Sequence, residues 1–195
     1  MRRLFIYTVL FLVTYIVNIN AQVFENTAIK LGGVVAFQVN NQAPRLGLSF
    51  GISKDIISWD NISITSELSY VQKGYSSNLT STTNGNNQSS SNNKLEYLSL
   101  LVFGRLRISG VISDDNTYLI CGISNNYFIT SRLAKEDYEK VTFGLLAGIG
   151  GEINISAPFK IILEFTINKD LTRATKNTTR ELRNITIELK SGIKF

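Results

Sequence analysis

The sequence RNITIELKSGIKF, Arg183–Phe195, decides the fold. Apolar residues occupy every second position, and polar or small residues lie between them. Successive side chains of a β-strand point to opposite faces of a sheet, so this pattern predicts a strand with two chemically different faces. The apolar face is Ile185, Ile187, Leu189, Ile193 and Phe195, and the other face is Thr186, Glu188, Lys190, Gly192 and Lys194.

The same period of two recurs along most of the chain, and almost no stretch after Gln22 has a helical period. Eight strands in succession, joined as antiparallel neighbours, predict an all-β, up-and-down barrel. The expected strands are Ala28–Val39, Arg45–Ser53, Asn61–Tyr75, Leu95–Ile108, Thr117 to about Thr130, Lys140–Ile153, a stretch beginning at Phe159, and Arg183–Phe195.

The segments between the strands differ in character at the two ends of such a barrel. The expected loops at one end are Asn40–Pro44, Ser76–Asn93, Arg132–Glu139 and Thr172–Arg183, and the expected turns at the other end are Lys54–Asp60, Ser109–Asn116 and Ser156–Pro158. Ser76–Asn93 is polar and of low complexity, which predicts a mobile loop. Long loops at one end and short turns at the other are typical of outer-membrane barrels.

The N-terminus predicts export. Arg2 and Arg3 precede the apolar run Leu4–Val17, which is shorter than the roughly 20 residues of a membrane-spanning helix. We therefore expect a cleaved signal peptide at residues 1–21 and one barrel domain at residues 22–195. Cys121 is the only cysteine, so no intramolecular disulfide is possible. The mature chain carries a net charge of about +3, which does not indicate nucleic-acid binding.

Alternation alone fits both a soluble lipocalin-like carrier and a membrane barrel. Strands of about ten residues, tilted near 40°, cover roughly 25 Å, which matches the apolar thickness of a membrane barrel. Facing lipid, a lysine near the bilayer midplane would cost about 2–4 kcal/mol. Two further sets favour the membrane barrel. The first is a set of aromatic residues near strand ends, Trp59, Tyr70, Tyr75, Tyr127 and Phe195, and the second is a glycine-rich inner face, Gly32, Gly47, Gly51, Gly144, Gly148, Gly150 and Gly192.

The polar faces predict the contents of the lumen. Eight strands leave an interior that is about filled by its own side chains, so we expect a plugged or very narrow lumen. Both charge signs occur on these faces, which predicts an internal ion-pair network. The expected lumenal charges are Lys30, Arg45, Glu67, Lys73, Arg105, Arg107, Glu152, Lys160, Glu164, Glu188, Lys190 and Lys194.

Several motifs, taken in order, resemble a known family. They are ELSYVQKGY at Glu67–Tyr75, LEYLSL at Leu95–Leu100, TYLICGISNNYFIT at Thr117–Thr130, FGLLAGIGGEI at Phe143–Ile153, and the terminal RNITIELKSGIKF. The chain is similar to the small outer-membrane β-barrel family of Gram-negative bacteria, the porin-family or PorT-like barrels. It departs from the family at Ser99-Leu100-Leu101, where a Glu-Ile-Pro is common, and at Ile167–Leu171, where a Tyr-Gly-Leu run is often seen.

The resemblance implies a location and a set of partners. It implies the outer membrane of a Gram-negative bacterium, with its lipid and lipopolysaccharide as surroundings. It also implies that Gly192, Ile193 and Phe195 form the C-terminal signal that the outer-membrane assembly machinery recognises. An extracellular or secretion-system protein is a further expected partner of unknown identity.

The composition argues against an enzyme. The chain contains no histidine, which excludes a Ser/His/Asp arrangement and a histidine-based metal site. We expect no catalytic residue, no cofactor and no metal. The leading hypothesis is a non-enzymatic barrel with a role in envelope structure or in partner binding through its outer loops. The alternatives are a component of a PorT-like secretion or assembly apparatus, a narrow small-solute channel, and a soluble lipocalin-like carrier.

Overall fold

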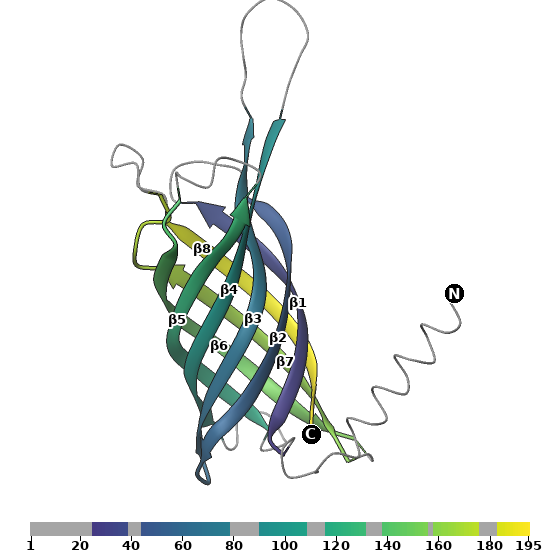
Figure 1. Ribbon diagram of the computed structural model, residues 1–195. Coiled ribbons are helices and arrows are strands. Elements are labelled where there is room, and N and C mark those ends of the chain that lie inside the picture. Colours follow the sequence, from purple (N-terminus) through teal and green to yellow (C-terminus); the bar gives the residue numbers. More distant parts are fainter. Residues whose placement is uncertain are drawn as a thin grey trace, which may run out of the picture.

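The computed structural model describes residues 25–38, 44–78, 90–108, 116–131, 138–155, 158–175 and 183–195. In this part of the chain, eight antiparallel strands form one closed barrel in sequence order (Figure 1). The predicted signal peptide, residues 1–21, lies outside the described residues. The strands are β1 Thr27–Gln38, β2 Arg45–Ser58, β3 Ile62–Asn78, β4 Ser90–Arg107, β5 Thr117–Ser131, β6 Val141–Asn154, β7 Lys160–Asp170 and β8 Asn184–Lys194.

The first and last strands close the barrel. β1 pairs with β8 from Ala28 opposite Lys194 to Gln38 opposite Asn184. The backbone pairing continues past the strand ends, because Asn26 donates to the Phe195 carbonyl at 3.0 Å and Phe195 donates to the Thr27 carbonyl at 2.9 Å. The C-terminal strand is therefore part of the wall along its whole length.

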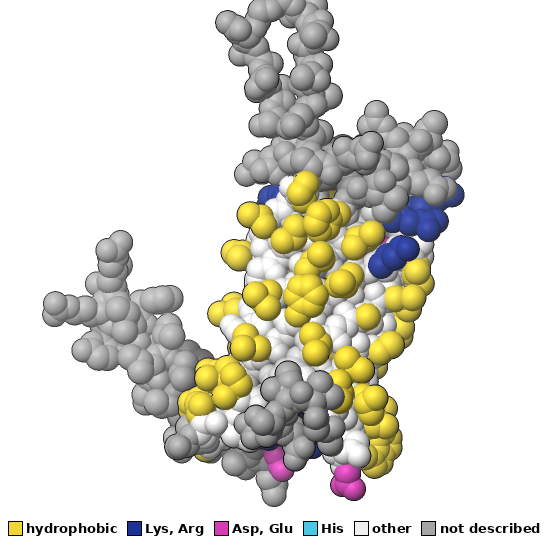
Figure 2. Space-filling model, turned by 180° about the vertical axis from the view of Figure 1, so that it is seen from behind, with side chains coloured by type: hydrophobic (Ala, Val, Ile, Leu, Met, Phe, Trp, Pro, Cys, Tyr) yellow, Lys and Arg dark blue, Asp and Glu magenta, His cyan; other side chains and the backbone are white. Residues whose placement is uncertain are grey.

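Alternate residues of each strand face opposite sides of the wall, and the apolar side faces outward. On β1, Lys30 is 1 % exposed, whereas its neighbours Ile29 and Leu31 are 41 % and 63 % exposed. Large apolar side chains are exposed on every strand, and they cover much of the outer surface in Figure 2. A soluble carrier would bury this surface, because soluble proteins rarely expose an apolar patch larger than a few hundred Å². The chain is an eight-stranded transmembrane β-barrel.

Aromatic residues mark the two edges of this apolar belt. Trp59, at the turn between β2 and β3, and the terminal Phe195 are exposed at the turn end, and Tyr127 is exposed near the loop end of β5. Tyr70 on β3 is half-buried, and the side chain of Tyr75 lies outside the described part. Such amphipathic rings are stable at the level of the lipid headgroups. The described part of the chain holds no helix with the length and apolar content needed to cross a bilayer.

Two expected connections are shorter than the sequence predicted. The segment Ser76–Asn93 is not wholly a loop, because β3 and β4 pair as far as Asn78 opposite Ser90. The neighbouring pairings end earlier, β2–β3 at Val71 and β4–β5 at Leu95. The remaining two-stranded β3–β4 ribbon, 74–78 with 90–94, rises beyond the barrel in Figure 1. Its polar sequence lacks alternation, but backbone hydrogen bonds continue a hairpin that the barrel has already aligned.

The second shortened connection is Lys54–Asp60. β2 continues to Ser58, and an irregularity between Asp55 and Ile57 shifts its register against β3. Ile56 and Ile57 are consequently both exposed, as expected at a β-bulge where an extra residue changes the alternation. Because the register shift interrupts the alternation, a strict period of two did not predict this end of the strand.

Candidate functional site

The candidate site is the lumen, where oppositely charged side chains alternate in one connected series. Among the described residues, every neighbour in the series is an ion pair with an N–O distance of 2.7–3.3 Å. We call this series the lumenal ion-pair chain; its order is Glu188, Lys190, Glu67, Lys30, Glu164, Arg105, Asp55, Lys194, Glu152 and Lys160.

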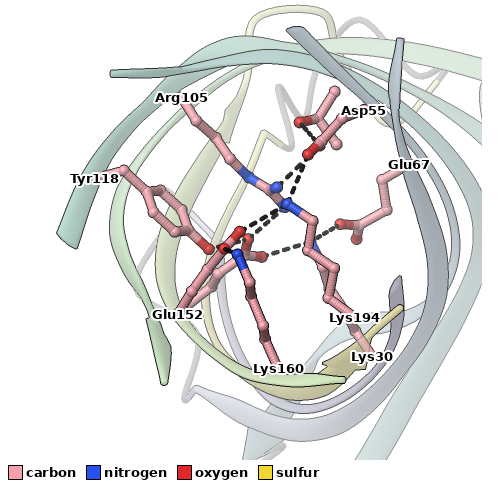
Figure 3. Close-up of polar contacts among 10 residues, drawn as sticks. Lys30, Asp55, Glu67, Arg105, Tyr118, Glu152, Lys160 and Lys194 are labelled. Carbon is pink, nitrogen blue, oxygen red and sulfur yellow. Dashed lines mark hydrogen bonds and ion pairs between the residues drawn. The ribbon is translucent and has the colours of Figure 1, made fainter. Parts of the chain in front are cut away.

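Glu164 on β7 lies at the centre of the lumenal ion-pair chain. Its Oε2 accepts from Lys30 Nζ at 2.7 Å, and its Oε1 accepts from Arg105 at 3.0 Å and from the Tyr118 hydroxyl at 2.9 Å. These partners come from β1, β4 and β5, so the contacts cross the lumen rather than follow one wall (Figure 3). One carboxylate thus joins three strands that are distant in sequence.

Lys30 links this centre to a second carboxylate. Its Nζ also donates to Glu67 Oε2 at 2.8 Å, and Glu67 Oε1 accepts from Lys190 at 2.8 Å. Lys30, Glu67 and Glu164 are each 1–2 % exposed. Buried charges are tolerated when each has an opposite charge and further hydrogen bonds, and these groups have both.

The turn end of the lumen is closed by a group around Asp55. Its two carboxylate oxygens accept from Arg105 at 3.0 Å and from Lys194 at 2.7 Å, and Thr65 donates to it at 2.6 Å. Lys194 also donates to Glu152 at 2.8 Å (Figure 3). Glu152 is shared with Lys160, whose side chain is 44 % exposed, so the lumenal ion-pair chain ends at the solvent.

A second polar layer lies towards the loop end. Lys73 pairs with Asp170 at 3.3 Å, and Asp170 also accepts from the side-chain amides of Asn126 at 3.1 Å and Asn184 at 3.0 Å. Lys73 also lies over the Tyr97 ring, 5.2 Å from its centroid. This layer uses mostly neutral donors around one carboxylate, so it is less charged than the lumenal ion-pair chain.

Aromatic side chains cover this layer. Tyr97 packs edge-to-face on Phe128 with ring centroids 5.6 Å apart, and Phe128 stacks on Tyr138 at 5.4 Å. Leu95 and Tyr97 are 0 % exposed. An isolated bridge joins Tyr138 to Thr175, so the segments that follow β5 and β7 meet above this cluster. A continuous water channel would expose lumenal side chains, so the described lumen is packed.

One wall of the lumen is apolar. A buried cluster from β4, β5 and β6 lines it, and Arg105 lies over two of its rings, 5.4 Å from the Phe103 centroid and 5.0 Å from the Tyr118 centroid. Guanidinium groups bind aromatic faces favourably, so this wall holds Arg105 in place from one side. The cluster is Leu101, Phe103, Tyr118, Ile120 and Leu146.

Glycines provide the space for these long side chains. A Cβ added to Gly150 would lie 2.5 Å from the Tyr118 ring, and one added to Gly32 would lie 2.8 Å from Lys190 Cγ. Gly192 faces Lys30 across the strand pair and would meet its side chain in the same way. By contrast, Gly33 points outward and has nothing within 4 Å. The inward glycines therefore sit where a neighbouring strand sends a large side chain across the lumen.

Most of the expected charges lie in the lumen, and one does not. Arg107 is exposed and donates to the Asp60 carbonyl at the turn end, so the prediction that it is lumenal was wrong. The reason is that β4 ends at this residue, beyond the enclosed part of the barrel. Arg45 is half-buried at the start of β2, and Lys160 lies at the rim. The remaining expected charges are buried: Lys30, Glu67, Lys73, Arg105, Glu152, Glu164, Glu188, Lys190 and Lys194.

Among the lumenal residues that were not predicted are Asp55, Asp170 and Tyr118. Asp55 was assigned to a turn, although it belongs to β2, and Asp170 was placed in a run treated only as a departure from a family motif. Asp170 continues the alternate positions Glu164, Thr166 and Asn168, and this alternation would have placed it on the inner face. Tyr118 was missed because no faces were assigned to its strand.

The predicted C-terminal signal residues lie on the wall near the turn end. Ile193 and Phe195 are 43 % and 44 % exposed on the outer surface, and Gly192 lies against Lys30 on the inner side. Phe195 also lines a cavity of about 260 Å³ at the turn-end mouth, together with Phe159, Lys160 and Lys194. Among the described residues, no three potential metal ligands of the His, Cys, Asp or Glu type are gathered.

Comparison with known proteins supports the fold. No protein-family model matches the sequence, and no curated protein matches it. The crystal structure of Neisserial surface protein A matches with a TM-score of 0.51 and 12% identity over 88% of this chain and 98% of that one. At this identity the likeness establishes the shared barrel fold.

Two other solved structures are similar over the same part of the chain. The attachment invasion locus protein Ail of Yersinia pestis has a TM-score of 0.45 and 12% identity, covering 88% of this chain and 99% of that one. The outer membrane protein AlkL in DMPC lipid bilayers has a TM-score of 0.46 and 11% identity, covering 88% and 92%.

Proposed function

We propose that this protein is a non-enzymatic barrel of the Gram-negative outer membrane, in which the lumen is a structural plug and the loop end contacts partners. The observation that carries this proposal is the lumenal ion-pair chain. Its five acids and five bases cancel one another within the described residues, and most are buried. A pore that selects ions presents a ring of one charge sign to mobile ions, whereas this arrangement pairs its charges with one another.

The location of the two ends supports the orientation. Both termini of the barrel lie at the turn end, and the β3–β4 ribbon projects from the loop end (Figure 1). Outer-membrane barrels place short turns in the periplasm and long loops outside the cell. The ribbon is then the part of the described chain that reaches farthest from the bilayer, and a partner would meet it first.

The C-terminus supports a role in assembly. Ile193 and Phe195 present two apolar side chains on the outer surface of the closing strand, while Gly192 keeps the inner side clear for Lys30. We propose that the assembly machinery binds this apolar face before β8 pairs with β1. Phe195→Ala should then slow the appearance of the heat-modifiable folded form in cells but leave refolding of the purified chain into detergent unchanged. Equal slowing in both settings would refute the assembly role.

Conductance tests the plugged lumen. The purified barrel in planar bilayers should give no steps of the size of a general porin. Glu164→Gln and Lys30→Met, which leave side chains of similar length in place, should remain closed, because the aromatic cluster at Tyr97 still covers the lumen. Steady conductance steps in the unmodified protein would refute the plug.

Deletion of the ribbon tests where partners bind. Joining Gly74 to Lys94 through an Asn-Gly turn should leave heat-modifiable migration intact while abolishing adhesion or partner binding of whole cells. Unchanged surface binding would refute the assignment to the ribbon. Loss of a secreted cargo in a deletion strain, with adhesion unchanged, would instead support the PorT-like secretion role.

A further inference from the structure

Short polar side chains line one level of the lumen, between the lumenal ion-pair chain and the second polar layer. Each of β2, β3, β4 and β5 contributes one serine there, and all four are 1–3 % exposed. Ser69 is directly opposite Ser99. Because the strands of a barrel are tilted, residues at one height shift by about one residue from strand to strand, which places Ser49 and Ser124 at the height of this pair. We call Ser49, Ser69, Ser99 and Ser124 the serine layer.

Half of the serine layer has hydrogen-bond partners within the protein. The Ser99 hydroxyl donates to Asn126 at 2.7 Å, and the Ser124 hydroxyl donates to Asn168 at 3.0 Å. The hydroxyls of Ser49 and Ser69 are equally buried, but neither has a hydrogen-bond partner in the described part of the chain. Two hydroxyls of the serine layer therefore require a partner that the described residues do not supply.

Two buried groups on β7 and β8 share this property. Thr166 and Glu188 are directly opposite each other, and each is 2 % exposed. Thr166 Oγ1 and Glu188 Oε2 have no hydrogen-bond partner among the described residues, although Lys190 Nζ forms an ion pair with that carboxylate oxygen at 3.1 Å. Glu188 ends the lumenal ion-pair chain, so it has one cationic partner there, whereas each of the other acids in that series has two.

The groups without partners lie close to one another. A Cβ added to Gly32 would lie 2.7 Å from Ser49 Oγ and 2.8 Å from Lys190 Cγ, so the hydroxyl and the lysine side chain adjoin the same point. Lys190 in turn contacts Glu188. Ser49 is therefore beside the buried end of the lumenal ion-pair chain.

Ser69 reaches the same region from β3. A Cβ added to Gly51 would lie 2.9 Å from Ser69 Cβ and 3.2 Å from Glu67 Oε1. This Glu67 oxygen accepts from Lys190 at 2.8 Å. Lys190 therefore connects the surroundings of Ser69 with those of Ser49 and Glu188.

Water is the ligand that suits this set of groups. Buried polar side chains almost always have a partner, and an ordered water is the usual one where the protein provides none. A water molecule can accept from the serine and threonine hydroxyls and donate to the Glu188 carboxylate. A metal cation is disfavoured, because the Lys190 ammonium already contacts Glu188 and because no three His, Cys, Asp or Glu ligands gather among the described residues.

We propose that the serine layer, Thr166 and Glu188 enclose an internal chamber of ordered water in the middle of the lumen. The short serine side chains leave room there, whereas an eight-stranded lumen is otherwise about filled by its own side chains. The lumenal ion-pair chain closes the chamber towards the turn end, and Lys73 with Tyr97 closes it towards the loop end. This inference goes beyond the proposed plug, because it gives the lumen two packed ends with hydrated groups between them.

Removal of one hydroxyl tests the proposal by the sign of its effect. If water binds Ser69, Ser69→Ala breaks a hydrogen bond and should lower the folding equilibrium constant in vesicles about fivefold. If the hydroxyl has no partner, the same substitution removes an unsatisfied buried group and raises the constant. The matched control is Ser191→Ala, at an exposed outward position of β8, which should change the constant by less than about twofold.

A crystal structure of the purified barrel gives a second readout, which does not depend on the folding of a variant. It should show ordered water within hydrogen-bond distance of Ser49, Ser69, Thr166 and Glu188. Soaking in rubidium chloride should leave this density unchanged, because only a bound monovalent cation would exchange for the heavier ion.

Three outcomes would overturn the proposal: a folding constant that rises or stays unchanged in Ser69→Ala, a lack of ordered water at these groups in the crystal, or rubidium in its place. Conductance steps in the unmodified protein would instead refute the plug, so the two failures are distinguishable.

Discussion

Removal of the charge of Glu164 perturbs the lumenal ion-pair chain at its centre. Glu164→Gln keeps the size of the side chain and one carbonyl oxygen, so the main change is the loss of one negative charge. Lys30 and Arg105 lose a shared partner, at 2.7 Å and 3.0 Å, in a site from which water is excluded. Glu67 and Asp55 still pair with them, so both cations keep one acid.

Breaking a buried ion pair costs about 3–5 kcal/mol. Because each cation keeps a second partner, we expect the free energy of unfolding to fall by about 3 kcal/mol, the lower end of that range. The matched control is Glu96→Gln in the more exposed Lys94–Glu96 pair, where the loss should be about 0–1 kcal/mol. A Glu→Gln substitution is therefore expected to lower the free energy of unfolding more in the buried pair than in the more exposed one.

The assay is guanidinium unfolding in phosphatidylcholine vesicles. Trp59 is the only tryptophan and is exposed at the turn end, so its fluorescence reports the loss of the membrane environment. Heat-modifiable gel migration gives an independent folded fraction. A loss below about 1 kcal/mol for Glu164→Gln, equal to the control, would refute the reasoning. Lys30→Met combined with Glu164→Gln restores the charge balance and should cost less than the sum of the two single variants.

Three further predictions follow from the packing. Gly32→Ala places a Cβ 2.8 Å from a backbone carbonyl and should lower the free energy of unfolding by about 1–3 kcal/mol in the same assay. Gly33→Ala has open space around its Cβ and should be near neutral. Equal effects of the two substitutions would contradict the lumenal packing. Leu189→Lys, near the middle of the outer wall, should lower the free energy of unfolding by about 2–4 kcal/mol, and Leu171→Lys, at the loop-end edge, by about 0–1 kcal/mol. The absence of this gradient would contradict the position of the apolar belt. Tyr97→Ala should cost about 3–5 kcal/mol in gel-monitored unfolding without opening a conductive path, since the lumenal ion-pair chain lies below it; conductance in this variant would contradict that order of layers.

The alternation of the sequence was sufficient to predict the eight strands and the faces of all of them except β5. It predicted that Ile185, Ile187 and Leu189 share a face, and the outward direction followed from the cost of turning Lys190 to lipid. It could not predict the exact strand ends. The bulge after Asp55 breaks the period, and the ribbon beyond Gly74 depends on backbone pairing that its Ser- and Asn-rich sequence does not encode.

The lumenal site was only partly predictable. The alternation along a strand assigns a charged residue to the inner face, but it does not predict which partner that residue contacts across the lumen. Glu67 meets Lys30 and Lys190 because of the stagger between distant strands, which no single strand contains. Arg107 occupies an inner-face position in the alternation of its strand. It is nevertheless exposed, because it lies at the turn end of the barrel, beyond the enclosed lumen.

The orientation of the wall is tested most directly by nitroxide accessibility along β5. The native Cys121 is exposed on the outer face with Leu119 and Ile123, and Ile120 and Ser124 are buried inside. Labels at Cys121, and at Leu119 and Ile123 in a Cys121→Ser background, should collide freely with oxygen and poorly with a water-soluble nickel chelate in vesicles. Labels at Ile120 and Ser124 should meet neither reagent readily. Nickel accessibility at Leu119, Cys121 and Ile123 would mean that this face lies in water, and the transmembrane account would be wrong.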